Sequence, residues 1–196
     1  MILAIPKREL EFVLATVAIN QNGISKLFAN KNNKTLLETL KSHKYKHLSA
    51  TVHQRYGDAL NDKLGEFLYH LKINGDEFYR QFLNKYGDEV FCRFSISEHL
   101  KSMGLYCFVM GGAVTYIGRS HDPFGKRINQ GYGNISPKNC YRDGQATNCH
   151  LNSLIAGHCE QLALYICTLT NDAEIDALEK VLIRQYQPEW NIALKT

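Results

Sequence analysis

The sequence predicts an α+β fold in which a small antiparallel sheet flanked by helices occupies the C-terminal half, preceded by a mainly α-helical accessory domain. Two observations predict it. The composition shifts near residue 100, from a Lys-, Asn- and Leu-rich half with helical periodicity to a half with short strands and glycine turns. After that point the elements follow the order strand, strand, helix, long insert, strand, helix. We therefore predict two domains, 1–100 and 101–196.

Apolar residues recur at helical spacing in three stretches of the first half, 24–40, 60–71 and 78–86. The turn-like run 30–33 divides the first stretch, so residues 24–43 are compatible with a helix-turn-helix. Aromatic stripes at this spacing are more typical of a hydrophobic core than of a surface that stacks bases. We interpret the first hundred residues as a mainly helical domain.

Two strands joined by a tight turn open the second half. Residues 104–110 and 114–118 have strand composition, and Gly111-Gly112 between them is a hairpin-turn signal. A helix that contains Arg127 is expected next, because Pro123 can occupy its first turn.

A long polar segment, a strand and a helix complete the chain. Residues 131–148 are interpreted as a loop and residues 162–169 as the third strand. Asn171 and Glu174 form a capping pair for a final helix that stops before Pro188.

Basic residues gather in two islands, although the formal net charge is only +4 and 44% of residues are hydrophobic. Only Glu38 opposes the basic residues of 26–55, and a second island spans 119–142. Two such islands fit contact with a polyanion, whereas solvated lysine-rich faces are the alternative. The residues of the first island expected to contact the polyanion backbone are Lys41, Lys44 and Lys46.

The apolar start is interrupted by Arg8, Glu9 and Glu11, so no secretory signal is expected. No apolar run is long enough to cross a bilayer, and no membrane partner is expected. We predict a cytoplasmic protein whose cysteines remain reduced.

Short motifs in the second half resemble the GIY-YIG nuclease family. The first strand carries Gly104-Leu105-Tyr106, and the second carries Tyr116-Ile117-Gly118 after nine residues. Arg127 follows in the next helix, and 179–191 resembles the closing segment of the family. The resemblance covers about residues 102–196. It implies a GIY-YIG-like sheet and metal-dependent hydrolysis of DNA phosphodiester bonds, with double-stranded DNA as the partner.

The chemistry needs a positioned water, a group that takes its proton, and cationic help for the phosphoryl oxygens. Free tyrosine titrates at about pH 10, so a tyrosine base requires a nearby cation. Arg127 and a hard divalent cation on Glu179 can supply that charge, while the alternative for both motif tyrosines is a half-buried strand position. The resemblance implies that the catalytic residues are Tyr106, Tyr116, Arg127, Glu179 and Asn191, with Mg²⁺ or Mn²⁺ on Glu179.

Some positions depart from the family pattern or remain open. Many members have His or Tyr one helical turn beyond the arginine, but here Gly131 stands there with Tyr132 beside it. Asn191 could bond the backbone or contact a phosphate. Asp172 and Asp176 sit at a helix start, where a carboxylate needs no special explanation. Residues expected to contact the substrate are Arg119, Lys126, Tyr132, Gln145 and Asn148.

Glu179 lies on the apolar stripe of the final helix, where a carboxylate is costly unless something pairs with it. An ion pair with Arg127 or Arg184 is the structural alternative to a bound metal cation. If Glu179 is a metal ligand, its loss should abolish cleavage and keep the fold. If it is only an ion-pair partner, its loss should lower the stability of the protein.

The insert contains Cys140, Cys149, His150, His158 and Cys159, of which four could bind zinc. The spacing lacks a tight CxxC pair, and we predict no structural zinc. The amides of Gln145 and Asn148 could pair with adenine, whereas a polar loop with a helix cap is the alternative.

Within the family we favour a sequence-specific restriction-type endonuclease, because the chain is compact and has an insert where specificity could be built. A homodimer is expected if the target is palindromic. The alternatives are a structure-selective repair or recombination nuclease, and a non-catalytic DNA-binding protein on a nuclease fold.

Overall fold

The computed structural model describes residues 1–6 and 8–193 and consists of two compact units. Unit 1 comprises Met1–Asn22, Cys92–Asn134 and Leu154–Thr196, and unit 2 comprises Gly23–Phe91 and Ile135–Ser153. The predicted α+β class with a small antiparallel sheet is confirmed. The predicted boundary near residue 100 differs from this division, because residues 1–22 belong to the same unit as the C-terminal sheet and part of the insert belongs to the helical unit.

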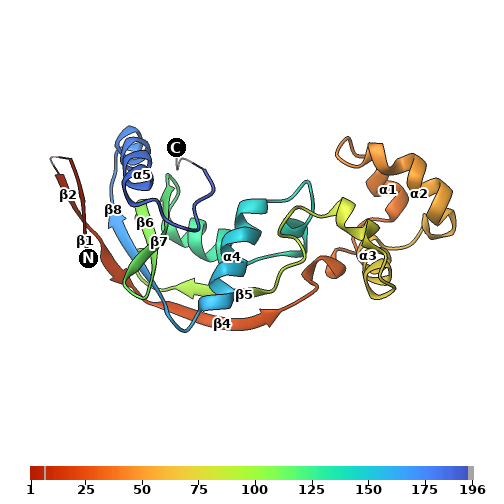
Figure 1. The fold of residues 1–196 in the computed structure, drawn as a ribbon, viewed down its shortest axis with the longest axis horizontal. Helices are drawn as coiled ribbons and strands as arrows, with labels where there is room; N and C mark the ends of the chain where they lie inside the picture. The colour runs from red at the N-terminus through yellow and green to blue at the C-terminus, as the bar shows by residue number, and fades with distance from the viewer. Residues whose placement is uncertain (7, 194–196) are drawn as a thin grey trace. The chain divides into compact units, whose positions relative to one another are not determined.

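Unit 1 is built on a four-stranded antiparallel sheet in the order β3-β8-β6-β7 (Figure 1). The predicted hairpin is confirmed, with Tyr106 of β6 opposite Gly118 of β7. Gly111 and Gly112 turn the chain with φ values of 57° and 83°, which suit glycine. The strands are β3 (Val13–Ala15), β6 (Gly104–Met110), β7 (Ala113–Ser120) and β8 (Leu162–Thr168).

Helix α5 (Asp172–Tyr186) covers one face of this sheet (Figure 1). The predicted cap is confirmed, since Oδ1 of Asn171 accepts a hydrogen bond from the backbone N–H of Glu174 at 3.0 Å. Side chains alternate along a strand, so the α5 face takes Leu105 and Ile117 and the other face takes their neighbours. The core between sheet and helix includes Leu105, Cys107, Val109, Ile117, Ile175, Leu178, Leu182 and Ile183.

The opposite face of the hairpin is covered by the π-helix η5 (Gly125–Tyr132). The predicted helix after Pro123 is confirmed, and the backbone N–H of Arg127 donates to the Pro123 carbonyl at 3.0 Å. Phe124 is fully buried, with its ring centroid 6.2 Å from that of Tyr106. The face that carries the motif tyrosines therefore lies under a helix.

Strands also occur where the sequence predicted a mainly helical domain, and that prediction is wrong for these segments. The strands β2 and β4 are short or largely exposed, so they lack the clear alternation that would mark them. Two strand pairs form: β1 (Ile2–Ile5) with β2 (Arg8–Glu11), which are antiparallel, and β4 (Val17–Ile24) with β5 (Phe91–Ile96).

Unit 2 is helical. The expected helix pair in 24–43 is instead a 3₁₀ turn, η1 (Leu27–Asn30), and the five-residue helix α1 (Leu36–Leu40). The aromatic stripes are core, as predicted, with Tyr79 and Phe82 buried. The other helical elements are η2 (Lys46–Leu48), α2 (Ser49–Tyr56), η3 (Gly57–Ala59), α3 (Leu64–Ile73) and η4 (Glu77–Phe82).

The polar segment 131–148 is not one long loop. It contains the end of η5, the 3₁₀ turn η6 (Pro137–Cys140) and the start of α4 (Ala146–His158). Polar composition here reflects exposed helix surface and turn-forming side chains, such as Asn139, which bonds Ser136. Among the residues described, no helix has both the length and the apolar character needed to cross a bilayer.

Candidate active site

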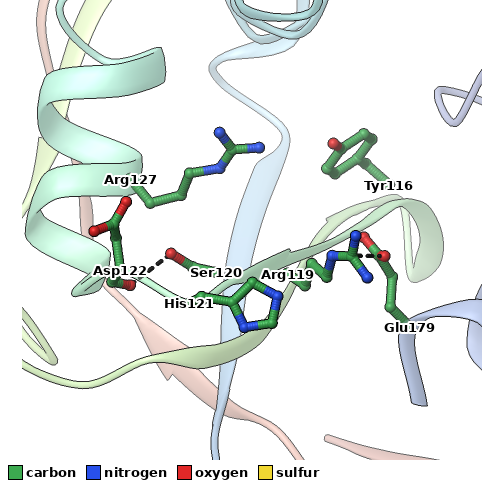
Figure 2. Close-up of a pocket in the computed structure, with 7 residues that line it drawn as sticks. All are labelled: Tyr116, Arg119, Ser120, His121, Asp122, Arg127 and Glu179. Atoms are coloured by element: carbon green, nitrogen blue, oxygen red, sulfur yellow. Dashed lines mark hydrogen bonds and ion pairs between the residues drawn. The ribbon is translucent and has the colours of Figure 1, made fainter. Parts of the chain in front are cut away.

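A pocket of about 370 Å³ lies in unit 1 beside the edge strand β7 (Figure 2). Its walls come from β7, the turn after it, η5 and α5. Figure 2 shows the Tyr116 hydroxyl and the Arg127 guanidinium directed toward each other, with Arg119 and Glu179 paired beside them. The lining residues are Tyr116, Arg119, Ser120, His121, Asp122, Arg127 and Glu179.

The edge position of β7 explains why groups from both faces of the sheet reach one pocket. Arg119 shares the α5 face with Ile117, whereas Tyr116 points to the η5 face. The closing segment covers the first part of this edge, since the N–H of Trp190 donates to the carbonyl of Thr115 at 2.8 Å. The pocket lies beside the part of β7 that follows this covered stretch.

Gly104 and Gly118, the glycines of the two motifs, lie where a side chain would clash with its neighbours. A Cβ at Gly118 would lie 2.5 Å from the hydroxyl oxygen of Tyr106, its partner across the hairpin. Gly104 has φ of 136°, and a Cβ there would collide with the carbonyl oxygen of Cys167. The glycines therefore let the Tyr106 ring lie flat over β7 and let β6 approach β8 closely.

Three tyrosine side chains meet next to Arg127. The hydroxyl oxygens of Tyr106 and Tyr132 are 2.8 Å apart, and the ring centroids of Tyr106 and Tyr116 are 6.1 Å apart. The guanidinium carbon of Arg127 lies 4.7 Å from the centroid of the Tyr132 ring. Only Tyr116 of the three lines the pocket, and Tyr106 and Tyr132 are completely buried behind it.

The π-helical form of η5 explains how Tyr132, and not Gly131, comes to lie one helical turn beyond Arg127. Tyr132 follows Arg127 by five residues, a spacing that an α-helix would place on a different side. A π-helix bonds residue i to residue i+5 and so brings such positions together, as the 2.7 Å bond from the Gly133 N–H to the Ile128 carbonyl shows. Tyr132 is therefore the aromatic residue one turn beyond Arg127.

Burial raises the pKa of Tyr106, Tyr116 and Tyr132, and the charge of Arg127 opposes this shift without cancelling it. Burial also lowers the pKa of Arg127, but the phenol groups of Tyr106 and Tyr132 outweigh that effect and the net shift is upward. The tyrosine hydroxyls are therefore protonated at neutral pH while Arg127 stays charged.

Arg127 also has an unused donor. Its Nε is the one buried side-chain nitrogen or oxygen in residues 1–6 and 8–193 that has no hydrogen-bond partner. A buried donor without an acceptor is unfavourable.

Glu179 projects from α5 with only 12% of its side chain exposed. Burial raises the pKa of this carboxyl, and the nearby Arg119 lowers it. Its ion-pair partner is Arg119, with 3.3 Å between Nε and Oε2, and not Arg127 or Arg184 as the sequence suggested. The expectation was wrong because Arg119 lies on the β7 face that packs against α5.

The sequence missed a set of charges around this pair. Arg119 also contacts Asp176, with 2.6 Å between Nη1 and Oδ1. His121 bridges two carboxylates, with Nε2 2.8 Å from Asp176 Oδ1 and Nδ1 2.9 Å from Asp172 Oδ1. Asp172 begins α5 and Asp176 follows in the next turn, near the helix start, where a carboxylate is ordinary, so no sequence signal set them apart.

Asn191 binds backbone. Its Oδ1 accepts from the Ile117 N–H at 2.9 Å and its Nδ2 donates to the Ile117 carbonyl at 2.8 Å. This is the first of the two roles left open by the sequence. The buried amide thus holds the chain end against β7, and we correct its assignment from catalytic to positioning.

The remaining predicted contact residues are dispersed. Lys126 is exposed and paired with Asp122 at 2.8 Å in unit 1. Asn148 is 4% exposed and donates to Gln145 at 2.5 Å in unit 2, which corrects the expectation that Asn148 contacts a base. The lysines of the first basic island are exposed in unit 2, without an ion pair among the residues described: Lys41, Lys44 and Lys46.

No group of three His, Cys, Asp or Glu side chains suited to a metal ion occurs in the described part of the chain. Of the insert residues considered for zinc, Cys140, Cys149 and His150 belong to unit 2, and His158 and Cys159 belong to unit 1. Two carboxylates line the pocket, Asp122 and Glu179, and Glu179 is the largely buried one, with 12% of its side chain exposed against 55% for Asp122.

No family model, curated protein or solved structure matches this chain.

Proposed function

We propose that this chain is a divalent-metal-dependent DNA endonuclease of the GIY-YIG type. The observation that carries the proposal is the convergence of Tyr116, Arg127 and Glu179 on one pocket, from three different elements. A proton acceptor, a phosphate-binding cation and a carboxylate are the groups that phosphodiester hydrolysis needs. Their arrangement at the end of an edge strand leaves room for a substrate from solvent.

Glu179 fits the requirement for a hard cation. Mg²⁺ in proteins is commonly held by one or two carboxylates and several waters, so one carboxylate donor is sufficient. Burial raises the pKa of Glu179, and a cation beside it would restore the charged form. When bound, Mg²⁺ or Mn²⁺ would polarise a phosphoryl oxygen and lower the pKa of a coordinated water.

Arg127 is suited to the phosphate. Its planar guanidinium can bind two phosphoryl oxygens, and its buried Nε has no other partner. Stacking against the Tyr132 ring holds the guanidinium at the pocket wall. It would stabilise charge that develops on the phosphoryl oxygens in the transition state.

Tyr116 is the hydroxyl that a water in the pocket can reach. The ring of Tyr116 lies 6.1 Å from that of Tyr106, and the Tyr106 hydroxyl is hydrogen-bonded to that of Tyr132, so the three side chains form one cluster. Tyr116 would first lose its own proton to solvent in the pocket, a step that the charge of Arg127 favours against the effect of burial, and the phenolate would then take a proton from the attacking water. Tyr106 and Tyr132 are then positioning residues behind Tyr116.

We favour a sequence-specific restriction-type enzyme acting on double-stranded DNA. The experiment is digestion of plasmid DNA with Mg²⁺, with end sequencing of the products and the Glu179→Gln protein as control. A fixed set of cut sites that needs Glu179 is the expected result. Cutting confined to branched or damaged DNA would instead indicate a structure-selective nuclease. DNA binding without any cutting would indicate a non-catalytic protein.

A further inference from the structure

Arg119 ties two carboxylates of α5 together at the pocket wall (Figure 2). Its Nε lies 3.3 Å from Oε2 of Glu179, and its Nη1 lies 2.6 Å from Oδ1 of Asp176. The two carboxylates are three residues apart on one helix and so share a side of it. A guanidinium thus occupies the carboxylate to which the proposed function assigns the metal cation.

Asp176 is the firmer of the two anchors for Arg119. Its shorter contact is supported by His121, whose Nε2 lies 2.8 Å from the same Oδ1 and whose Nδ1 lies 2.9 Å from Asp172. The Arg119 side chain is 36% exposed, so its guanidinium has solvent on one side and can shift. If Glu179 were taken by another cation, Asp176 would still hold Arg119 through Nη1.

We propose that Arg119 couples the binding of a divalent cation at Glu179 to the binding of a DNA phosphate in the same pocket, an inference that rests on the proposed function. The guanidinium competes for Glu179, because two cations close together on one carboxylate repel each other. Once displaced, Arg119 keeps its contact with Asp176 and offers its Nε–H to a phosphoryl oxygen.

The coupling works in both directions. A phosphate that binds Arg119 draws the guanidinium away from Glu179 and strengthens cation binding there. By thermodynamic reciprocity, a cation at Glu179 strengthens phosphate binding at Arg119 by the same factor. The DNA-free protein would therefore hold its cation weakly, and the site would be completed when DNA arrives.

The test is Mn²⁺ binding to DNA-free protein, followed by the electron paramagnetic resonance signal of the free ion. Arg119→Ala and Arg119→Gln should each bind Mn²⁺ roughly tenfold more tightly than the parent, since Glu179 loses its internal competitor. The Glu179→Gln protein defines the site, and its affinity should fall sharply. Melting temperatures report whether each variant is folded.

Lys180→Ala is the matched control, because it removes the same charge from the exposed residue next to Glu179. Its Mn²⁺ affinity should stay within about twofold of the parent, since the charge of an exposed side chain is screened. An equal gain in Lys180→Ala would overturn the coupling, because the general field of the protein would then explain it.

Two other outcomes are decisive. Folded Arg119 variants that bind Mn²⁺ no more tightly than the parent would overturn the coupling while leaving the metal site at Glu179 in place. If neither the parent nor any variant bound Mn²⁺ at a site that depends on Glu179, the metal-dependent function itself would fall.

Discussion

The two units of the chain bury tyrosine hydroxyls in opposite ways. In unit 2 the hydroxyls of buried tyrosines have fixed acceptors: Tyr79 donates to Asp88 at 2.7 Å, and Tyr141 donates to the carbonyl of Phe28 at 2.9 Å. Burial and then the hydrogen bond to Asp88 raise the pKa of Tyr79 to about 12. Two further pairs of this kind are Tyr45 with Asp143 and Tyr56 with Asp76.

In unit 1 the hydroxyls face one another. Either oxygen of the Tyr106–Tyr132 pair can be the donor, so the geometry does not fix the direction of the hydrogen bond. The charged neighbour is Arg127, whose positive charge lowers the pKa of all three tyrosines against the effect of burial. A carboxylate acceptor favours the protonated hydroxyl, whereas a neighbouring cation favours the deprotonated form. The comparison separates tyrosines with a fixed acceptor from the cluster to which the proposed function assigns the proton transfer.

The largest effect is expected at Glu179, the carboxylate that lines the pocket with Tyr116 and Arg127. Glu179→Gln should lower DNA cleavage by roughly 10³ or more, because several kcal/mol of transition-state stabilisation by the cation would be lost. The fold should persist, since Arg119 keeps Asp176 as a partner. Plasmid cleavage and the melting temperature of the same variant give the answer.

A different result would make Glu179 structural. If this carboxylate served only as an ion-pair partner, Glu179→Gln protein would melt at a lower temperature and its folded fraction would still cut DNA. Full activity with an unchanged melting temperature would remove the metal site from the proposal.

The tyrosine comparison can be tested by one conservative change in each unit. Tyr116→Phe should slow cleavage by ~10², the scale for a positioned proton-transfer group, with DNA binding retained. Tyr79→Phe removes the same atom from a buried ring, but Asp88 keeps Lys72 at 2.5 Å. It should cost about 1 kcal/mol of stability and leave cleavage unchanged. Equal losses of cleavage in both variants would erase the distinction between the two kinds of tyrosine.

The basic island of unit 2 gives a smaller effect, on binding. Replacing Lys41, Lys44 and Lys46 together by Ala should weaken DNA binding for all sequences and reduce the salt slope by roughly 0.9 per lost phosphate contact. The measurement is the dissociation constant across a series of salt concentrations. A slope equal to that of the parent would leave these lysines as a solvated face.

Local signals in the sequence predicted the hairpin, the helix after Pro123 and the capped helix α5, because each depends on neighbours in the chain. Turn glycines and an Asn cap specify short-range hydrogen bonds that form in this way whatever the rest of the fold does. The elements that the sequence did not predict have partners far away in the chain, such as β3, which pairs with β8. No pattern within three exposed or small residues specifies that pairing.

In the pocket, too, features that depend on the order of motifs along the chain were predicted, and features that depend on distant packing were not. Tyr116, Arg127 and Glu179 were predicted from motif order, and the pocket contains all three. The ion pair of Arg119 with Glu179 was not predicted, because it depends on which face of β7 meets α5. The role of Tyr132 depended on a π-helix, and its hydrogen-bond pattern leaves no mark in residue composition.

The smallest expected effect concerns His121, whose imidazole contacts Asp172 and Asp176. The hydrogen bond to Asp172, and then the charges of both carboxylates, raise the pKa of His121 above its ordinary value of 6.5. A raised folded-state pKa adds stability that is complete below the unfolded pKa and is lost as pH rises through the folded one. His121→Gln should therefore lower the melting temperature more at about pH 6 than at about pH 8.5.

The size of this difference is limited by exposure, since 40% of the His121 side chain is accessible to solvent. Screening should hold the contribution to ~0.5 kcal/mol, and added salt should reduce it further. His53→Gln is the control, because the His53 ring is hydrogen-bonded to the hydroxyl and carbonyl of Ser49 and has no ion pair with a carboxylate among the residues that the structure describes. If His53→Gln showed the same dependence on pH, or if His121→Gln showed none, the carboxylates around His121 would not be acting on its charge. The case for a shared charge network beside Glu179 would then rest on Arg119 alone.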